Sequence, residues 1–333
     1  MPAPSNSERE QAALVACQAA LALGVTSVQS CEGPDEFSAL AKIEQEDRLG
    51  VRVWHMVPLE SLPQALAMGL RTGFGSEMLR IGHVKMFADG ALGSATAEML
   101  APYEGAPDNL GVAVTSTKDL LAAARDAARG GLACAIHAIG DLANQRVLDV
   151  YEALQRELPA LRYRQRIEHV QLINPRDVAR LARLGVVASM QPIHSTQDIE
   201  MADRQWGART QNAYVFRDLL TAGATLAFGT DCPVEALDPL AGLYAAVTRQ
   251  HADGTPQGGW HPAQRLTLDE ALYAYTMGAA YASYQEQLKG SLTPGKWADL
   301  VVLSTDIHAA DPEALLTARA ELTISGGQVV HTA

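Results

Sequence analysis

Short apolar runs and longer amphipathic stretches follow one another in a regular order along most of the chain. The apolar runs predict seven strands, near residues 25–30, 51–57, 83–88, 132–138, 164–170, 186–192 and 225–230. The stretches between them carry helix signals. Strands that alternate with helices are typical of a parallel sheet wrapped by helices, so we expect an α/β fold.

Two capping boxes mark the starts of helices in this pattern. Ser7 with Glu10 is expected to open the first helix, and Thr267 with Glu270 a late one. A long polar segment, 195–213, interrupts the alternation. We expect this segment to lie over the functional site.

The number of strands narrows the architecture. Seven strands are one short of a (β/α)8 barrel of the TIM type, and we expect such a barrel without one strand. An open doubly wound sheet is the rival fold, but no Gly-x-Gly-x-x-Gly follows the first strand. Beyond Lys289 the pattern changes to short strands separated by turns.

Composition and charge point to small-molecule chemistry. Of the 333 residues, 48% are hydrophobic and 19% are charged, which is typical of a globular protein. The formal net charge is −12. A field of this sign disfavours nucleic acids and anionic membranes as partners, because both carry phosphate.

The ends and the cysteines of the sequence suggest a cytoplasmic protein. The first ten residues lack the basic and apolar regions of a leader peptide, and no apolar run reaches the roughly 18–20 residues of a membrane span. The four cysteines, Cys17, Cys31, Cys134 and Cys232, lie far apart and form no Cys-x-x-Cys pair. We expect reduced thiols rather than a disulfide framework or a zinc knuckle.

Candidate chemistry gathers at the carboxyl ends of the predicted strands. Lys85, His137, His169 and Asp231 each stand at or just after an apolar run. In a barrel these strand ends meet at one mouth, where such enzymes place their active sites. Two imidazoles and a carboxylate are the donors that a catalytic Zn²⁺ or a similar divalent ion prefers.

Each of these residues also has a structural interpretation. His137 and His169 could be hydrogen-bonded residues of the core or rim, Asp231 could cap a turn, and Lys85 could serve in a salt bridge. Their equivalent positions on four strands favour the shared site. Arg249 is expected to pair with an acidic neighbour on a helix rather than to reach the mouth.

Several motifs resemble the metal-dependent amidohydrolase superfamily, and within it the amidohydrolase family 3 that includes the N-substituted formamide deformylases. The resemblance covers nearly the whole chain and rests on VKMFADGALGS, IHAIGDLANQRVLD, RIEHVQLINPRDVARLARLGVVASMQPIH, GTDCPVEALDPLAGLYAAVTR and the segment from LTLDEALYAYTMGAAY to ADLVVL. It implies an incomplete TIM-barrel hydrolase domain over residues 1–288. Residues 289–333 would be the C-terminal strands of a small β-domain.

The resemblance also implies roles for single residues. Lys85, His137, His169 and Asp231 would bind one or two divalent ions, most often zinc, with Lys85 carboxylated so that its oxygens bridge the metals. A free lysine ammonium has three donors and no acceptor atom, so without this modification it could not act as a metal ligand. Asp231 would take a proton from the metal-activated water and return it to the departing amine.

Three further residues complete the expected site. Gln191 and His194 match a motif that would contact the substrate or polarise its carbonyl, although they could equally form a hydrogen-bonded pair that stabilises a loop. Asp141 would orient a loop or a ligand.

One departure from the family pattern bears on activity. The superfamily places a His-x-His pair on its first barrel strand, and this sequence contains no His-x-His. The missing strand of the barrel is therefore expected to be the first, as in an N-terminally truncated relative. Its loss would leave two sheet edges unpaired unless a neighbouring chain or a local rearrangement covers them, and self-association is one expectation.

Two functions follow as hypotheses. The first is hydrolysis of a carbon–nitrogen bond in a small non-peptide amide, using a divalent metal. The second is a catalytically inactive remnant or binding protein that keeps the amidohydrolase fold. Phosphotriester or lactone hydrolysis by the same centre also stays open, because the ligands activate water without selecting the electrophile.

Overall fold

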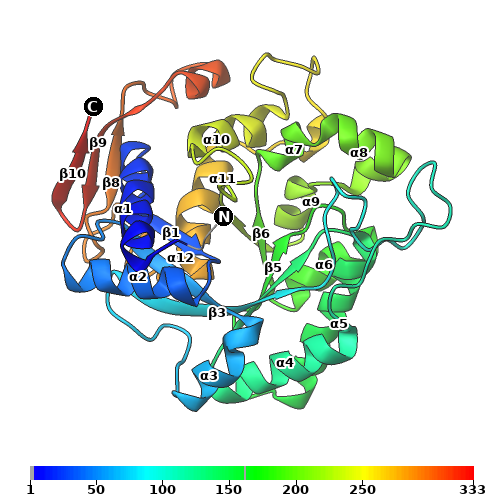
Figure 1. Ribbon diagram of the computed structural model, residues 1–333. Coiled ribbons are helices and arrows are strands. Elements are labelled where there is room, and N and C mark those ends of the chain that lie inside the picture. Colours follow the sequence, from blue (N-terminus) through cyan, green and yellow to red (C-terminus); the bar gives the residue numbers. More distant parts are fainter. Residues whose placement is uncertain (1–3, 161–162) are drawn as a thin grey trace.

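The computed structural model describes residues 4–160 and 163–333. Seven parallel strands form one curled sheet in chain order, as Figure 1 shows. They are β1 (Ser27–Ser30), β2 (Arg52–Pro58), β3 (Leu79–Phe87), β4 (Cys134–Ala138), β5 (Arg166–His169), β6 (Val187–Met190) and β7 (Thr225–Phe228). The predicted seven-stranded barrel is confirmed.

Helices connect the strands, and several of them cover the outer face of the sheet (Figure 1). They are α1 (Asn6–Ala22), α2 (Pro34–Gln45), α3 (Leu62–Ala67), α4 (Thr117–Gly130), α5 (Asp141–Glu157), α6 (Pro175–Arg183), α7 (His194–Gln197), α8 (Ile199–Trp206), α9 (Phe216–Thr221), α10 (Pro239–Thr248), α11 (Leu268–Tyr273) and α12 (Ala279–Ala282). None of the helices described here is both long and apolar enough to cross a membrane.

Two helix predictions need correction. The first helix is capped by Ser5 with Glu8, rather than by Ser7 with Glu10. The two pairs have the same spacing. The helix begins two residues earlier than expected, so Ser5 and Glu8 are the residues that cap its first turn. The polar segment 195–213 is mostly helical, because Trp206 and the apolar residues near it are buried. The box of Thr267 with Glu270 is confirmed.

The main core lies between the strands and their outer helices. Cys134 and Ile136 lie on the face of β4 that is turned toward the helices, and they pack against the apolar stripes of α4 and α5. A second cluster lies beneath α1 and α2, where Leu21 and Ile43 contact Val53 of β2. The four cysteines form no disulfide, as expected.

The gap between the edge strands β1 and β7 is covered by the chain itself. The segment from α11 through a π-helical turn (Ala274–Gly278) to α12 lies between them (Figure 1). The Gln29 amide of β1 donates a hydrogen bond to the Ala279 carbonyl at 3.1 Å. On the other side, Gly278 lies so close to the Leu226 carbonyl of β7 that no side chain fits. A local rearrangement therefore covers part of both edges.

A small antiparallel sheet stands beside α1. It contains β8 (Leu300–Leu303), β9 (Ala320–Ser325) and β10 (Gln328–Thr332) in the order β10-β9-β8. A buried ion pair joins it to the barrel, because Arg52 of β2 donates two hydrogen bonds to Asp299, at 2.7 and 3.1 Å. The predicted domain boundary after residue 288 stays a prediction.

Arg249 does not pair with an acidic residue on a helix, so that prediction is wrong. Its side chain is fully buried, with Nε donating to the Trp260 carbonyl at 3.0 Å and Nη1 to the Tyr214 carbonyl at 3.3 Å. The rings of Tyr214, Phe216 and Trp260 surround the guanidinium. Burial lowers the pKa of Arg249 to about 9.

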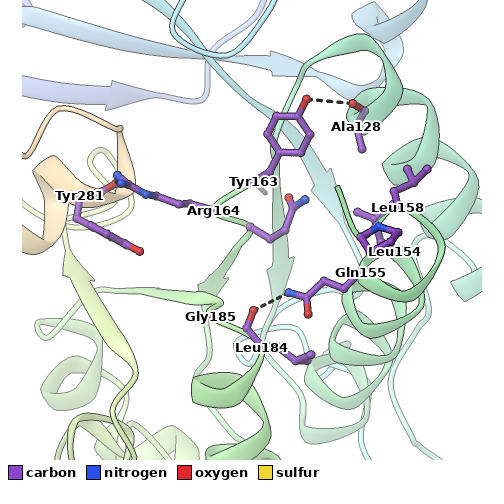
Figure 2. Close-up of a pocket in the computed structure, with 11 residues that line it drawn as sticks. Ala128, Leu154, Gln155, Leu158, Tyr163, Arg164, Leu184, Gly185 and Tyr281 are labelled. Carbon is purple, nitrogen blue, oxygen red and sulfur yellow. Dashed lines mark hydrogen bonds between the residues drawn. The ribbon is translucent and has the colours of Figure 1, made fainter. Parts of the chain in front are cut away.

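A hollow of about 400 Å³ opens at the amino-terminal end of the sheet (Figure 2). Arg164 precedes β5 and Leu184 precedes β6, and both line it. The Tyr163 hydroxyl donates to the Ala128 carbonyl at 3.1 Å, and the Gln155 amide donates to the Leu184 carbonyl at 2.7 Å. The candidate ligands follow the other ends of the strands, so this hollow is not their site.

Candidate metal centre

The structure brings the predicted site residues to the carboxyl-terminal mouth of the sheet. Lys85 lies near the end of β3, His137 in β4, His169 at the end of β5, and Asp231 just beyond β7. Parallel pairing of consecutive strands places these ends side by side. The His137 and His169 rings meet edge to face, with centroids 4.6 Å apart.

Three side chains come within reach of one ion. One ligand atom each of His169, His194 and Asp231 lies within 4.8 Å of the other two. His194 Nε2 is 3.8 Å from Asp231 Oδ2. Both imidazoles are buried, whereas the Asp231 side chain is 36% exposed, so the group faces the opening of the mouth.

The imidazole of His169 is oriented by Gln191. Its Nδ1 lies 2.9 Å from Gln191 Oε1, which can only accept. Nδ1 therefore carries the proton, and Nε2 keeps its lone pair for a ligand. Gln191 thus acts on His169 directly, and the expected contact of Gln191 with substrate stays a prediction.

His137 is held at the same mouth by a backbone contact. Its Nε2 lies 2.9 Å from the Gly90 carbonyl oxygen, so Nε2 donates and Nδ1 is left as the acceptor. The Asp89 carboxylate lies 3.6 Å from the same Nε2. Among the described residues, His137 is outside the group whose ligand atoms lie within 4.8 Å of one another.

Asp89 is a site residue that the sequence reasoning missed. Its carboxylate is buried and accepts hydrogen bonds from the backbone of Glu98, Ile139 and Gly140, at 2.9, 3.0 and 2.8 Å. Burial raises its pKa to about 7, against the opposing effect of these three donors. Asp89 follows a predicted strand just as Asp231 does, and that position was the available signal.

Asp141 orders a loop, as expected. It is the first residue of α5, and its Oδ1 accepts hydrogen bonds from the Leu100 and Leu142 backbone at 2.8 and 3.0 Å. Leu100 belongs to the segment between β3 and α4, so the contact ties that loop to the start of the helix.

A buried ion pair lies beneath the candidate ligands. Arg166 and Glu168, both in β5, are joined by two hydrogen bonds of 2.9 and 3.1 Å. Burial raises the pKa of Glu168, but the charges of Arg166 and Lys85 outweigh it and leave this pKa below its usual value. The Lys85 ammonium lies 4.5 Å from the centroid of the Phe87 ring. The charges of Lys85 and Glu168 therefore contribute to the electrostatic potential near the candidate ligands.

The imidazoles of the mouth are neutral at physiological pH. Burial and the charge of Lys85 lower the pKa of His137 to about 4, and burial lowers that of His194 to about 4. Burial, with the charges of His137 and Lys85, lowers the pKa of His169 well below its usual value. Neutral imidazoles are the form that binds metal.

Strained backbone marks two of the candidate ligand positions. His169 has φ +77° and the following Val170 has φ +47°, while Asp231 has φ +60°. Residues with side chains rarely adopt this left-handed region, least of all a β-branched valine. Strain of this kind persists where the surrounding structure enforces it, and it clusters at functional sites.

The donor set fits a divalent ion. The group offers imidazole nitrogen and carboxylate oxygen, and Zn²⁺ binds both. The His194 Nε2 atom is buried and has no hydrogen-bond partner among the described residues, and a bound ion could serve as its partner. The pKa of Asp231 is raised by burial and by Glu168, against the effect of Lys85, which suits a carboxylate that accepts a proton.

The chain is similar to known proteins over most of its length. The model of the amidohydrolase family matches residues 2–331. Protein LONG AFTER FAR-RED 3 of Arabidopsis thaliana is 34% identical over 91% of this chain and 54% of its own length. The N-substituted formamide deformylase of Arthrobacter pascens is 30% identical over 69% of this chain and 42% of its own length.

A solved structure is similar as well. An uncharacterized metal-dependent hydrolase of Pyrococcus horikoshii superposes with a TM-score of 0.83 and 31% identity, over 98% of this chain and 63% of the other. The chain thus spans about half the length of the curated relatives described above.

Proposed function

This chain belongs to the amidohydrolase family, and on that premise we propose that it is a metal-dependent hydrolase. Its substrate would be a small non-peptide amide, cleaved at a carbon–nitrogen bond. The observation that carries the proposal is the convergence of His169, His194 and Asp231 at the carboxyl-terminal mouth of the sheet. The formamide deformylase among the relatives supports an amide as the substrate class.

Lys85, His137, His169 and Asp231 are the residues that we propose to hold one or two ions. Their imidazoles are neutral, and carboxylation of the Lys85 amine would add the oxygen donors that the ammonium lacks. A divalent ion held there lowers the pKa of water and polarises a carbonyl group. Zinc as this ion, and the cytoplasm as the location of the protein, stay predictions.

Asp231 is the proposed proton carrier. Burial raises its pKa, so its carboxylate accepts a proton more readily than an exposed aspartate would. Its side chain is 36% exposed and faces the opening, where substrate and leaving group would lie. In this role Asp231 takes a proton from the attacking water and delivers it to the departing amine.

The buried residues would hold the site in place. Gln191 orients the His169 ring through a 2.9 Å contact, and the Gly90 carbonyl orients His137. The Arg166–Glu168 pair is buried and joined by two hydrogen bonds, and the charge of Lys85 acts on Glu168 as well. These contacts reduce the motion of the ligands before substrate binds.

The proposal is tested by hydrolysis of a panel of N-formyl and N-acetyl derivatives of small amines. Free amine is measured after chelator treatment and again after Zn²⁺ is restored. We expect turnover to disappear with chelation, to return with zinc and to be absent in His169→Ala. The exposed His308→Ala variant serves as the control. A chain that binds zinc yet cleaves no member of the panel would be the inactive remnant instead.

A further inference from the structure

We infer that His194 is itself a metal ligand, and that Gln171 orients it, so that one ion is held by His169, His194 and Asp231. This deepens the proposed function and rests on it, because both require a divalent ion at this mouth. In the assignment by family pattern, His194 contacts substrate instead. The ion of His169, His194 and Asp231 is one of the one or two ions proposed above, and Lys85 and His137 are not among its ligands.

The geometry supports three ligands around one ion. The candidate ligand atoms of His169, His194 and Asp231 lie within 4.8 Å of one another. Tetrahedral ligands bound to zinc at about 2.1 Å are about 3.4 Å apart, so binding requires only a modest contraction. Asp231 can supply most of it, because its side chain is partly exposed and the two imidazoles are buried.

Two unsatisfied atoms, one on each of two contacting side chains, point to the same arrangement. His194 Nε2 and Gln171 Oε1 are both buried without a hydrogen-bond partner among the described residues. Gln171 Nε2, however, lies 3.4 Å from His194 Nδ1. A 180° rotation of the amide exchanges its oxygen and nitrogen, so that Oε1 accepts a hydrogen bond from Nδ1–H. The rotation gives the amide oxygen a donor and moves the amide nitrogen to the position where the oxygen has no partner among the described residues.

The same rotation prepares His194 for a cation. With the proton on Nδ1, the lone pair of Nε2 faces Asp231 Oδ2 at 3.8 Å. Two acceptors cannot bond to each other, and the separation is too long for a hydrogen bond in either tautomer. Leaving a buried polar atom unsatisfied costs about 1–3 kcal/mol. A cation between the two atoms satisfies both of them.

The partner histidine already shows this arrangement. His169 donates Nδ1–H to Gln191 Oε1 and keeps its Nε2 lone pair. The two rings lie nearly parallel, at 25° and 6.1 Å between centroids. With the Gln171 amide rotated, each of the two imidazoles has a buried glutamine oxygen at Nδ1, which is the outer partner that fixes the tautomer of a metal-binding histidine.

The test is a titration of the full chain with Co²⁺, followed by the visible absorption of the bound ion. We expect His194→Ala to lose more affinity than the roughly 10–100-fold that follows loss of an outer partner, and more than His137→Ala loses. Gln171→Leu should lose about 10–100-fold, whereas Gln171→Glu keeps an acceptor at Nδ1 and should retain binding. The exposed His308→Ala should bind as the wild type does.

Folding and function are separated by further measurements. Circular dichroism checks each variant, and His194→Gln replaces His194→Ala if the alanine variant does not fold. The inference is overturned if the wild type binds Co²⁺ and the folded His194 variant binds it equally well, or if His137→Ala loses more affinity. If the wild type binds Co²⁺ as expected but cleaves no amide, the proposed function fails and the ligand assignment stands. A wild type that binds no metal overturns both.

Discussion

His83 makes the stability of the fold depend on pH. Its ring is fully buried in β3, where Nδ1 accepts a hydrogen bond from Trp54 Nε1 at 3.1 Å and Nε2 lies 3.1 Å from the Arg164 carbonyl. A second proton would have to sit on Nδ1, against the indole N–H. Burial and the charge of Arg166 lower the pKa of His83 to about 3.

The direction of the effect follows from this pKa. In the unfolded chain a histidine titrates near about 6.5, so between pH 6.5 and about 3 the unfolded state binds a proton that the folded state does not. Stability is therefore complete above about pH 6.5 and falls as the pH falls, by about 1.4 kcal/mol per pH unit. Down to pH 5, His83 alone costs about 2 kcal/mol.

Other buried groups contribute over the same interval. Burial lowers the pKa values of His55, His137 and His194 to about 4, so each should add a loss similar to that of His83. Asp89 acts in the opposite direction, because its pKa is raised to about 7 and its folded form gains a proton first as the pH falls. Burial also lowers the pKa of His169 well below its usual value, so His169 adds to the loss. The net loss between pH 6.5 and 5 is therefore several times that of His83 alone and comparable with the whole stability of a domain.

Urea unfolding at several pH values, followed by circular dichroism, measures this slope. We expect His83→Gln to reduce the slope by about 1.4 kcal/mol per pH unit, even though the variant is less stable at neutral pH. His308→Gln changes an exposed histidine and should leave the slope unchanged. If the two variants have the same slope as the wild type, the reasoning from burial of His83 is refuted.

Three further predictions concern stability, each measured by urea unfolding. Asp89→Ala removes the acceptor of three backbone donors and should cost at least about 2 kcal/mol; a loss below about 1 kcal/mol would contradict the anchoring role. Gly278→Ala places a methyl group against the backbone of β7 and should cost about 1–3 kcal/mol. Gly93→Ala should cost less, because its methyl group would only make an ordinary van der Waals contact with the Met201 sulfur at 3.8 Å. Asp299→Ala leaves the buried Arg52 without its ion-pair partner and should cost about 3–5 kcal/mol. It should also speed proteolysis of the segment that contains the small sheet. An unchanged rate of proteolysis would mean that other contacts hold the small sheet to the barrel.

The strands were predictable because each one is a buried run between polar connections. All seven overlap the predicted ranges, and the late capping box at Thr267 is where the pattern placed it. The first cap was missed because Ser5 and Ser7 have the same spacing to a glutamate, and only the path of the chain distinguishes them. The helices within 195–213 were missed because their buried side is short and broken.

The site was predictable in part. A position at the end of a strand was enough to bring His169 and Asp231 together, because parallel pairing aligns these ends. The contribution of His194 could not be found this way, since it lies beyond β6 at the start of α7 and reaches the mouth through a turn. Gln171 carries no signal in the sequence by itself; its role follows from the contact of its amide with His194 and from its unsatisfied amide oxygen.

The placement of the ligands bears on how the open barrel affects the site. His169, His194 and Asp231 come from β5 and from the segments after β6 and β7, which are consecutive strands paired to one another. Register within these pairs positions the three candidate ligands, and closure of the barrel is not required for it. The gap lies on the far side of β7, where α12 and the turn before it take the place of a neighbour. A change that loosens this cover should therefore lower stability before it lowers the affinity of the mouth for a metal.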